Sequence, residues 1–214
     1  MRSPRTRIRR VPRNARYDRA SVHRVLSRGQ VAHVSFVQDG QPYCIPTLYA
    51  RVGERVLIHG SSASRMVRIL ASGAPACVTV TLLDGVVLAR SAFETGANYE
   101  SVALLGRFRP VAGEPAKLAA LEAFMEAVLP GRWDEVRQPT RQELKGTAVL
   151  ELEIDEASVK TRGGPPDDDD SPDAARETWA GVIPVISRYG SPEPSPTLPA
   201  GRPLDPSIRA LLAG

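Results

Sequence analysis

Residues 30–60 read "QVAHVSFVQDGQPYCIPTLYARVGERVLIHG", and they contain the clearest signals for the fold. In its first part, apolar residues occupy every second position, at Ala32, Val34 and Phe36. That period of two is typical of a strand with one buried face. The Asp-Gly pair at 39–40 is a signal for a tight hairpin turn. The stretch therefore predicts two antiparallel strands joined by a hairpin.

The second of these strands, "PYCIPTLYARV" at 42–52, is interrupted by Pro46. Proline has no backbone N–H for a ladder, so it indicates an edge strand, a bulge or an opening in the sheet. The "VGE" at 52–54 turns the chain again, and "RVLIHG" at 55–60 predicts a third strand.

A strand, a turn and a helix are indicated by "IHGSSASRMVRILASG" at 58–73. The apolar residues at 66, 67, 69 and 70 give the helix one apolar face, and Gly73 is a typical helix stop. The first helical turn combines serine hydroxyls, free backbone N–H groups and the guanidinium of Arg65, a set that suits a phosphate. A serine cap beside a solvated arginine explains the same residues, so both interpretations stay open.

The rest of the chain continues in short strands and a few helices. The predicted elements are helices over 18–29 and 114–129, a short helix from 140, and strands over 75–83, 86–93, 101–111 and 147–154. A second Asp-Gly hairpin turn is predicted at 84–85. Because turn-linked strands outnumber crossover helices, we expect a mainly β fold, an antiparallel barrel with peripheral helices.

Several functional classes lack their sequence signals. No GxGxxG follows a strand and no GxxxxGK[ST], HExxH or GxSxG occurs, which argues against Rossmann, P-loop, zinc-protease and serine-hydrolase sites. Cys44 and Cys77 form no CxxC pair, so we expect a cytoplasmic protein with neither a disulfide scaffold nor a metal site. No apolar run approaches the ~18 residues of a membrane helix, so no membrane association is expected.

Both ends of the chain differ in composition from its middle. Residues 1–16 contain seven arginines and no acid, so they account for more than the whole net charge of +4 and predict a basic, disordered tail. Residues 17–162 form the predicted domain. Residues 163–214 form an acidic and proline-rich arm, in which Trp179 is expected to dock onto the domain or onto a partner subunit.

Taken in order, the segments from Tyr17 to Arg162 resemble the pyridoxamine 5'-phosphate oxidase-like split-barrel family. The similarity is greatest to its small flavin-nucleotide-binding branch, which includes nitroimidazole-resistance proteins. The resemblance implies a six-stranded antiparallel split β-barrel. It also implies a homodimer with FMN at the subunit interface and a small-molecule substrate.

The resemblance carries over to individual residues of the predicted FMN site. The strand along the isoalloxazine ring would comprise Cys44, Ile45, Pro46, Thr47, Leu48 and Tyr49. His59 and Gly60 match the next contacts, and His59 is the candidate catalytic residue. Ser64 and Arg65 match the phosphate grip, and Ser101 matches a polar contact before a later strand.

Some positions depart from the family pattern. Met66 stands where the pyridoxamine phosphate oxidases have a second basic phosphate ligand, and their C-terminal Arg/His substrate motif has no match, which argues against true pyridoxamine phosphate oxidation. In the loop at 93–101, Glu94, Thr95 and Glu100 replace the histidines and the base of the closer branch. Less positive charge near a phosphate weakens anion binding, which leaves haem or a deazaflavin as alternative cofactors.

Three functions follow from these observations. The first is an FMN-dependent oxidoreductase of a small molecule, in which the protein positions and tunes the flavin. The second is a haem-binding split barrel with His59 as an axial ligand. The third is a non-enzymatic flavin-binding or DNA-binding regulator that uses the arginine-rich tail, although the charge of the folded part does not favour a nucleic-acid partner.

Overall fold

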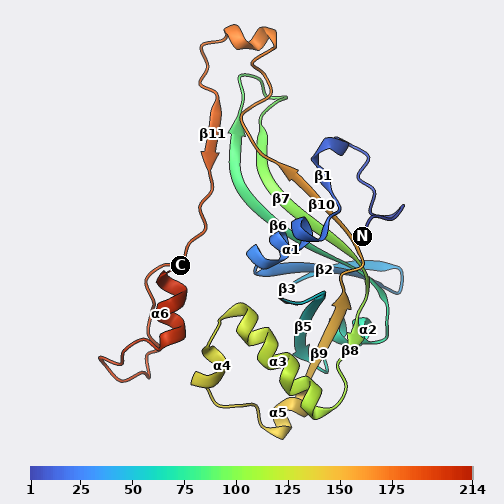
Figure 1. Cartoon of the computed structure of the whole chain (residues 1–214), viewed down its shortest axis with the longest axis vertical. Coiled ribbons are helices and arrows are strands. Elements are labelled where there is room, and N and C mark those ends of the chain that lie inside the picture. Colours follow the sequence, from blue (N-terminus) through green and yellow to red (C-terminus); the bar gives the residue numbers. More distant parts are fainter. Residues whose placement is uncertain (214) are drawn as a thin grey trace.

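The computed structural model describes residues 1–213 and consists of two antiparallel sheets with helices around them (Figure 1). The larger sheet has the strand order β1-β10-β7-β6-β2-β3, with β11 beside β6, and the smaller sheet has the order β4-β5-β9-β8. The strands are β1 (Ala15–Arg16), β2 (Val31–Gln38), β3 (Gln41–Leu48), β4 (Ala50–Val52), β5 (Arg55–Ser61), β6 (Pro75–Leu88), β7 (Gly96–Arg107), β8 (Arg109–Pro110), β9 (Thr147–Glu153), β10 (Glu156–Arg162) and β11 (Gly181–Pro184). The helices are η1 (Pro12–Asn14), α1 (Arg19–Arg28), α2 (Arg65–Ala71), α3 (Glu114–Val128), α4 (Arg132–Glu135), α5 (Arg141–Gly146), η2 (Pro172–Ala175) and α6 (Pro206–Ala213).

This architecture confirms a mainly β fold with peripheral helices, and it is consistent with a split barrel. The strand count of six is not confirmed, because the seven-stranded and four-stranded sheets also contain short edge strands such as β1, β8 and β11. None of the helices within residues 1–213 combines the length and the apolar character that crossing a membrane requires.

The β2–β3 hairpin forms where the sequence predicts it. Asp39 and Gly40 at its tip have φ values of 50° and 78°, the left-handed pair that a two-residue hairpin turn needs. β3 pairs with β2 on one side only and forms an edge of the larger sheet. Pro46 is tolerated there because its missing N–H removes no bond from the sheet interior.

The predicted hairpin turn at Asp84-Gly85 is wrong. β6 runs through both residues with a register shift between Leu83 and Gly85, and the chain reverses only after Leu88. Gly85 serves a close approach instead, since a Cβ there would lie 2.9 Å from Cγ1 of Val182 on β11. The Asp84-Gly85 pair thus forms a bulge within β6, and β11 packs against it.

The core lies between the two sheets and α1. Helix α1 begins at its predicted cap, where the Asp18 carboxylate accepts a hydrogen bond from the backbone N–H of Ser21 at 2.8 Å. Its apolar face and both sheets bury side chains with almost no exposure, among them Val22, Val25, Leu26, Ile58, Phe108 and Leu150. Burial of this set provides the main free energy that holds the sheets together.

Helix α3 covers the outer face of the smaller sheet. Its boundaries agree with the predicted helix, and Phe124 is its buried anchor, packed with Ala50 and Leu57. The capping box of α5 is also present, because the Thr140 hydroxyl accepts from the backbone N–H of Glu143 and the Glu143 carboxylate accepts from that of Thr140.

The N-terminal segment differs from the predicted disordered tail. Ala15 and Arg16 pair with β10, the carbonyl of Met1 accepts from the backbone N–H of Ala157, and Thr6 is buried. The sequence predicts disorder here because many like charges in a short segment disfavour a packed structure. Composition alone does not show that the edge of β10 provides backbone hydrogen-bond partners for this segment, or that Arg5 pairs with Glu156.

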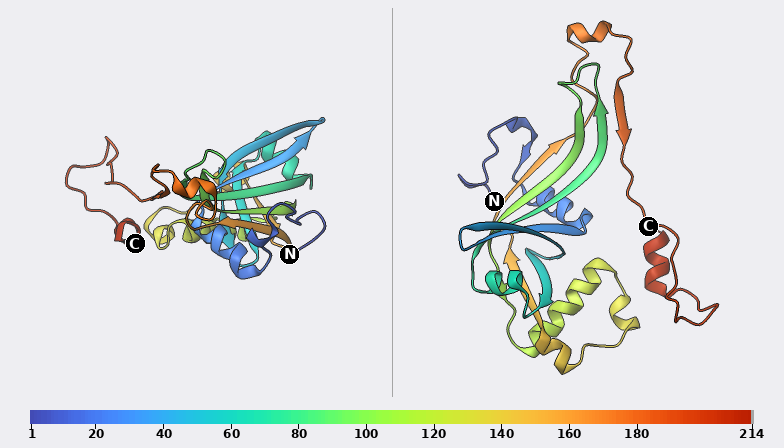
Figure 2. Two further views of the ribbon diagram at one scale, coloured as in Figure 1. Left: turned by 90° about the horizontal axis from the view of Figure 1, so that it is seen from above. Right: turned by 180° about the vertical axis from the view of Figure 1, so that it is seen from behind.

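The C-terminal arm leaves the barrel beyond the β6–β7 hairpin, runs beside β6 as β11, and ends in α6 (Figures 1 and 2). Its acidic run is anchored, because the fully buried Asp168 carboxylate accepts from the backbone N–H of Arg90 at 2.5 Å and pairs with the guanidinium of that arginine at 3.0 Å. Trp179 lies over Gly181 of the same arm and stays 63% exposed. Its docking onto a partner subunit stays a prediction.

Candidate cofactor site

The edge strand β3 exposes the residues that the sequence assigns to the flavin ring. Cys44, Pro46 and Leu48 are exposed on one face, whereas Ile45 and Thr47 are half-buried on the other. Cys44 and residues of the neighbouring strands β2, β6 and β7 line a trough of about 450 Å³ on the larger sheet. The free side of β3 leaves alternate backbone N–H and C=O groups available to a planar ligand with polar edges.

The side chain of Arg65, at the start of α2, reaches the same strand. The Arg65 guanidinium stacks over the ring of Tyr43 on β3, with its central carbon 4.2 Å from the ring centroid. Ser64 is the N-cap, but within the described residues its side chain makes no capping hydrogen bond. The Ser64 hydroxyl, the Arg65 guanidinium and the N–H groups of the first turn of α2 thus form one set of donors suited to a phosphate, and the Arg65 side chain links this set to β3.

Met66 and Gly60, which lie close to Arg65 in the sequence, have packing roles. Met66 is 8% exposed and belongs to the core, so a cation at this position could not reach a ligand without unburying it. A Cβ on Gly60 would lie 3.3 Å from Cγ2 of Val67, so the glycine permits the close packing of α2 on β5. Gly60 therefore positions α2, and through it Arg65.

His59 lies on the opposite face of β5 from Gly60. Its ring packs edge-to-face against Phe124 of α3, with 4.5 Å between centroids. Although part of the ring reaches solvent, desolvation by its surroundings lowers the pKa of His59 below its usual value. The imidazole is therefore neutral at pH 7 and retains a nitrogen lone pair that can bind a metal.

Tyr49 requires a correction. The sequence assigns it to the cofactor strand, but it is 3% exposed and its hydroxyl donates to the carbonyl of Leu26 at 2.6 Å. Burial raises its pKa well above the usual value. Tyr49 satisfies a carbonyl in the last turn of α1 and belongs to the core rather than to the site.

Ser101 is not brought next to β3 within one chain. It lies on β7, and the strand order places β6 and β2 between β7 and β3, a separation of about 14 Å at ordinary strand spacing. Its hydroxyl is 3.5 Å from the carbonyl of Lys160, a weak contact that leaves the oxygen available.

The sequence predicts that acidic residues in the 93–101 loop weaken phosphate binding, but the charge of Glu100 is already paired within the chain. Glu100 faces α1, where Arg24 and Arg28 bind its carboxylate at 2.6 and 2.7 Å and lower its pKa. Glu94 and Thr95 lie in the turn between β6 and β7, and the Thr95 hydroxyl donates to the carbonyl of Ser91. The charge of Glu100 is thus neutralised within the chain.

Tyr43 and Phe124 contact candidate site residues but are not predicted from the sequence. Tyr43 immediately precedes Cys44, and its position two residues before Ile45 indicates the same face of the strand. Phe124 contacts His59 only because α3 folds back over β5, and no local pattern signals that contact.

Comparisons with known proteins show which family the chain is similar to. A model of the family described as "Pyridoxamine 5'-phosphate oxidase" matches residues 18–161. The FAD and heme binding protein from Mycobacterium smegmatis is 43% identical, with a TM-score of 0.89, over 93% of this chain and 97% of that one. The flavocytochrome Anf3 from Azotobacter vinelandii is 41% identical, with a TM-score of 0.92, over 98% of this chain and 97% of that one.

A 5-nitroimidazole antibiotic resistance protein from Bacteroides thetaiotaomicron shares the fold at 16% identity, with a TM-score of 0.58 over 68% of this chain and 85% of that one. A search among curated proteins finds no match. The extent of the family match defines the class: the chain belongs to the pyridoxamine 5'-phosphate oxidase family of split-barrel proteins. Within that class it is similar over nearly its whole length to proteins whose names join a flavin with haem.

Proposed function

We propose that this protein is an electron-transfer oxidoreductase that binds a flavin at β3 and α2 and a haem at His59. The observation that carries the proposal is the division of the candidate residues by β5. Gly60 and α2, which bears Arg65, lie on one face of this strand, and His59 with Phe124 lies on the other. A single flavin would contact the residues on one face of β5, whereas a flavin and a haem would use the residues on both faces.

The flavin part rests on the residues around Arg65. A flavin phosphate needs charge and hydrogen-bond donors, which Arg65, Ser64 and the first turn of α2 supply, and the ring needs a flat edge with backbone groups, which β3 supplies. FAD is favoured over FMN because two proteins at 41% and 43% identity include a FAD binding protein and a flavocytochrome. A deazaflavin shares the phosphate and remains a ligand to test.

The haem part rests on His59. His59 would hold the haem iron through its neutral imidazole, because a free nitrogen lone pair is the group that iron binds and the ring is packed against Phe124. Flavin and haem supply electron exchange when bound. The chain itself keeps His59 unprotonated and orients its ring against Phe124.

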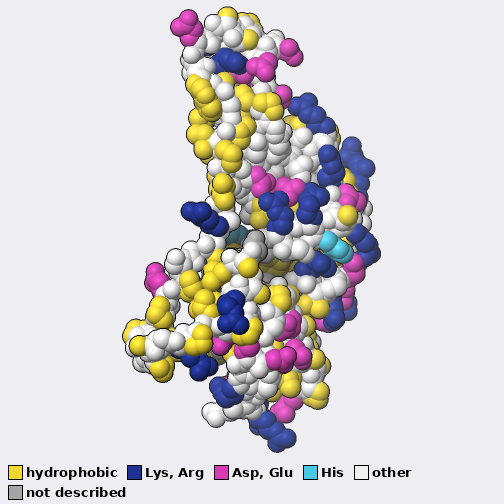
Figure 3. Space-filling model, turned by 60° about the vertical axis from the view of Figure 1, so that its left-hand side comes forward, with side chains coloured by type: hydrophobic (Ala, Val, Ile, Leu, Met, Phe, Trp, Pro, Cys, Tyr) yellow, Lys and Arg dark blue, Asp and Glu magenta, His cyan; other side chains and the backbone are white. Residues whose placement is uncertain are grey.

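A homodimer is part of the proposal, because each chain leaves apolar surface uncovered. Val31, Val37 and Leu48 are exposed on β2 and β3. Hydrophobic side chains also gather along the C-terminal arm (Figure 3), where Ile183 and Ile186 are exposed. A second subunit would cover these surfaces and bring its own Ser101 near β3. Light scattering tests this, and a monomer at micromolar concentration contradicts it.

The flavin site is tested by titrating cofactor-free protein with FAD, FMN and a deazaflavin while following flavin fluorescence or absorbance. Arg65→Ala should weaken FAD binding about tenfold or more, since it removes a charge-assisted contact to phosphate. Arg68→Ala is the matched control, an exposed arginine one turn later on α2. Equal affinities for both variants would remove Arg65 from the site.

The haem site is tested by reconstitution with haemin and measurement of the Soret band. His59→Ala should abolish the low-spin or five-coordinate histidine spectrum, whereas His33→Ala, an exposed histidine on β2, should leave it unchanged. An unchanged spectrum in His59→Ala excludes this residue as the ligand while leaving the flavin assignment intact.

A further inference from the structure

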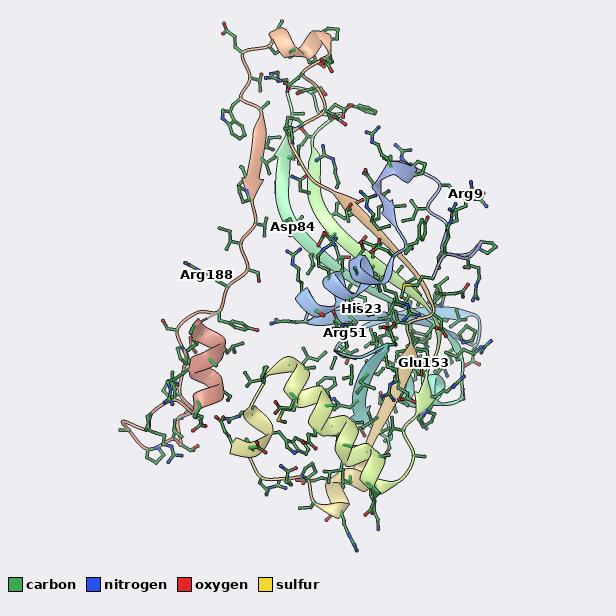
Figure 4. All side chains as sticks on the ribbon, in the orientation of Figure 1. Arg9, His23, Arg51, Asp84, Glu153 and Arg188 are labelled. Carbon is green, nitrogen blue, oxygen red and sulfur yellow. The ribbon has the colours of Figure 1, made fainter. Side chains whose placement is uncertain are left out.

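A second cavity lies away from the cofactor site, on the N-terminal segment. Its volume is about 610 Å³, and its lining is Arg2, Arg7, Ile8, Arg9, Pro12, Ala15 and Tyr17. This size lies within the range of small-molecule sites. Figure 4 places Arg9 on the side of the barrel opposite the C-terminal arm.

The segment that forms this cavity has a defined conformation. The backbone N–H of Ile8 donates to the Tyr17 hydroxyl at 2.8 Å, and Val11 adopts a left-handed conformation with φ 54° and ψ 61°. That conformation is costly for a β-branched residue, by about 1–2 kcal/mol, so the surrounding contacts must enforce it. The loop therefore holds its arginines around one space.

Within residues 1–213, the arginines of the cavity have no acidic partner. Among the residues that the structure describes, Arg2, Arg7 and Arg9 form no salt bridge, whereas Arg5 and Arg13 pair with acids and do not line the cavity. Guanidinium groups grouped without acids repel one another, and they bind phosphate oxygens through a planar fork of donors.

The cavity also has an apolar and aromatic part. Ile8 and Tyr17 line it, and the Arg2 guanidinium lies over the Tyr17 ring with 5.2 Å to the centroid. A simple phosphate would use the arginines and leave most of the volume empty. A ligand with several phosphates and a planar base would use both parts.

We infer that this cavity binds a nucleoside polyphosphate, at a site separate from that of the flavin. The two cavities share no lining residue, because Arg5 lines the trough with Cys44 and contacts Glu156 instead. The phosphates would meet Arg7 and Arg9, and the base would lie against Tyr17 and Ile8.

The test is calorimetric titration of the flavin-saturated protein with ATP, ADP, AMP, adenosine and inorganic pyrophosphate at 0.1 M salt. Saturation with flavin prevents the nucleotides from occupying the flavin site. Affinity should rise with the number of phosphates, adenosine should not bind, and pyrophosphate should bind more weakly than ADP. Arg7→Gln and Arg9→Gln should each weaken ATP binding about tenfold or more.

Arg13→Gln is the matched control, since Arg13 belongs to the same segment but pairs with Asp167 outside the cavity. It should leave ATP affinity unchanged, and Arg7→Gln should leave flavin affinity and the melting temperature unchanged. Absence of nucleotide binding at millimolar concentration overturns the inference, as does binding that Arg7→Gln and Arg9→Gln do not weaken. Tight binding of a single-stranded oligonucleotide without binding of ATP also overturns it, in favour of a nucleic-acid arm.

Discussion

Replacing Tyr49 by phenylalanine separates a role in the core from a role at the cofactor. The substitution deletes one hydroxyl, which donates to the carbonyl of Leu26 at 2.6 Å in a position that is 3% exposed. The carbonyl then loses its partner in a buried environment, at a cost of about 2 kcal/mol. For a domain of this size the melting temperature should fall by about 4–8 °C.

Two measurements on Tyr49→Phe decide the point: thermal unfolding and flavin titration. We expect the melting temperature to fall and the flavin affinity to stay the same. Tyr43→Phe is the matched control, because within the described residues the Tyr43 hydroxyl makes no hydrogen bond, while the ring that supports Arg65 is retained. Unchanged stability together with a large loss of flavin affinity in Tyr49→Phe would refute the assignment of this tyrosine to the core.

Three further predictions follow from buried or paired ionisable groups. Asp168→Asn weakens the buried contact to Arg90, so protease cleavage within 163–176 should accelerate about tenfold or more, and an unchanged rate contradicts this. Burial lowers the pKa of His59, so its protonation opposes folding below about pH 6.5. His59→Gln should then flatten the loss of stability as pH falls, and an NMR titration of His59 at or above the usual value would exclude this. Hydrogen bonds from Arg137 and Thr140 lower the pKa of Glu143 to about 2, so its stabilisation is present at neutral pH and is lost as pH falls from about 4.5 to 2. Acid unfolding of Glu143→Gln should lack that component, and an acid profile equal to that of the parent protein would contradict it.

Local chemistry predicts much of this fold. The Asp39-Gly40 turn, the Asp18 cap and the α5 capping box depend on residues close in sequence, and all three are present. Gly85 shows the limit of such signals. An Asp-Gly pair favours a turn, but the approach of β11 from nearly a hundred residues later makes it a bulge within a long strand.

The candidate site shows the same limit. A resemblance of sequence groups His59, Gly60 and Arg65 because they are neighbours in the chain, but alternation along β5 sends His59 toward α3 and Gly60 toward α2. The contact of Arg65 with Tyr43 depends on the packing of α2 against β5, β8 and β9, which no spacing in the sequence specifies. Long-range packing thus places the residues of one predicted site on two faces of β5.

We propose that this split barrel holds a flavin beside Arg65 and a haem at His59. The most direct test is the visible spectrum of the full chain purified from cells supplied with haem precursor, combined with identification of the released cofactors by mass. We predict a flavin absorption band with released FAD, together with a Soret band that His59→Ala removes. Protein that carries no flavin, and takes up none when FAD or FMN is added, would contradict the account.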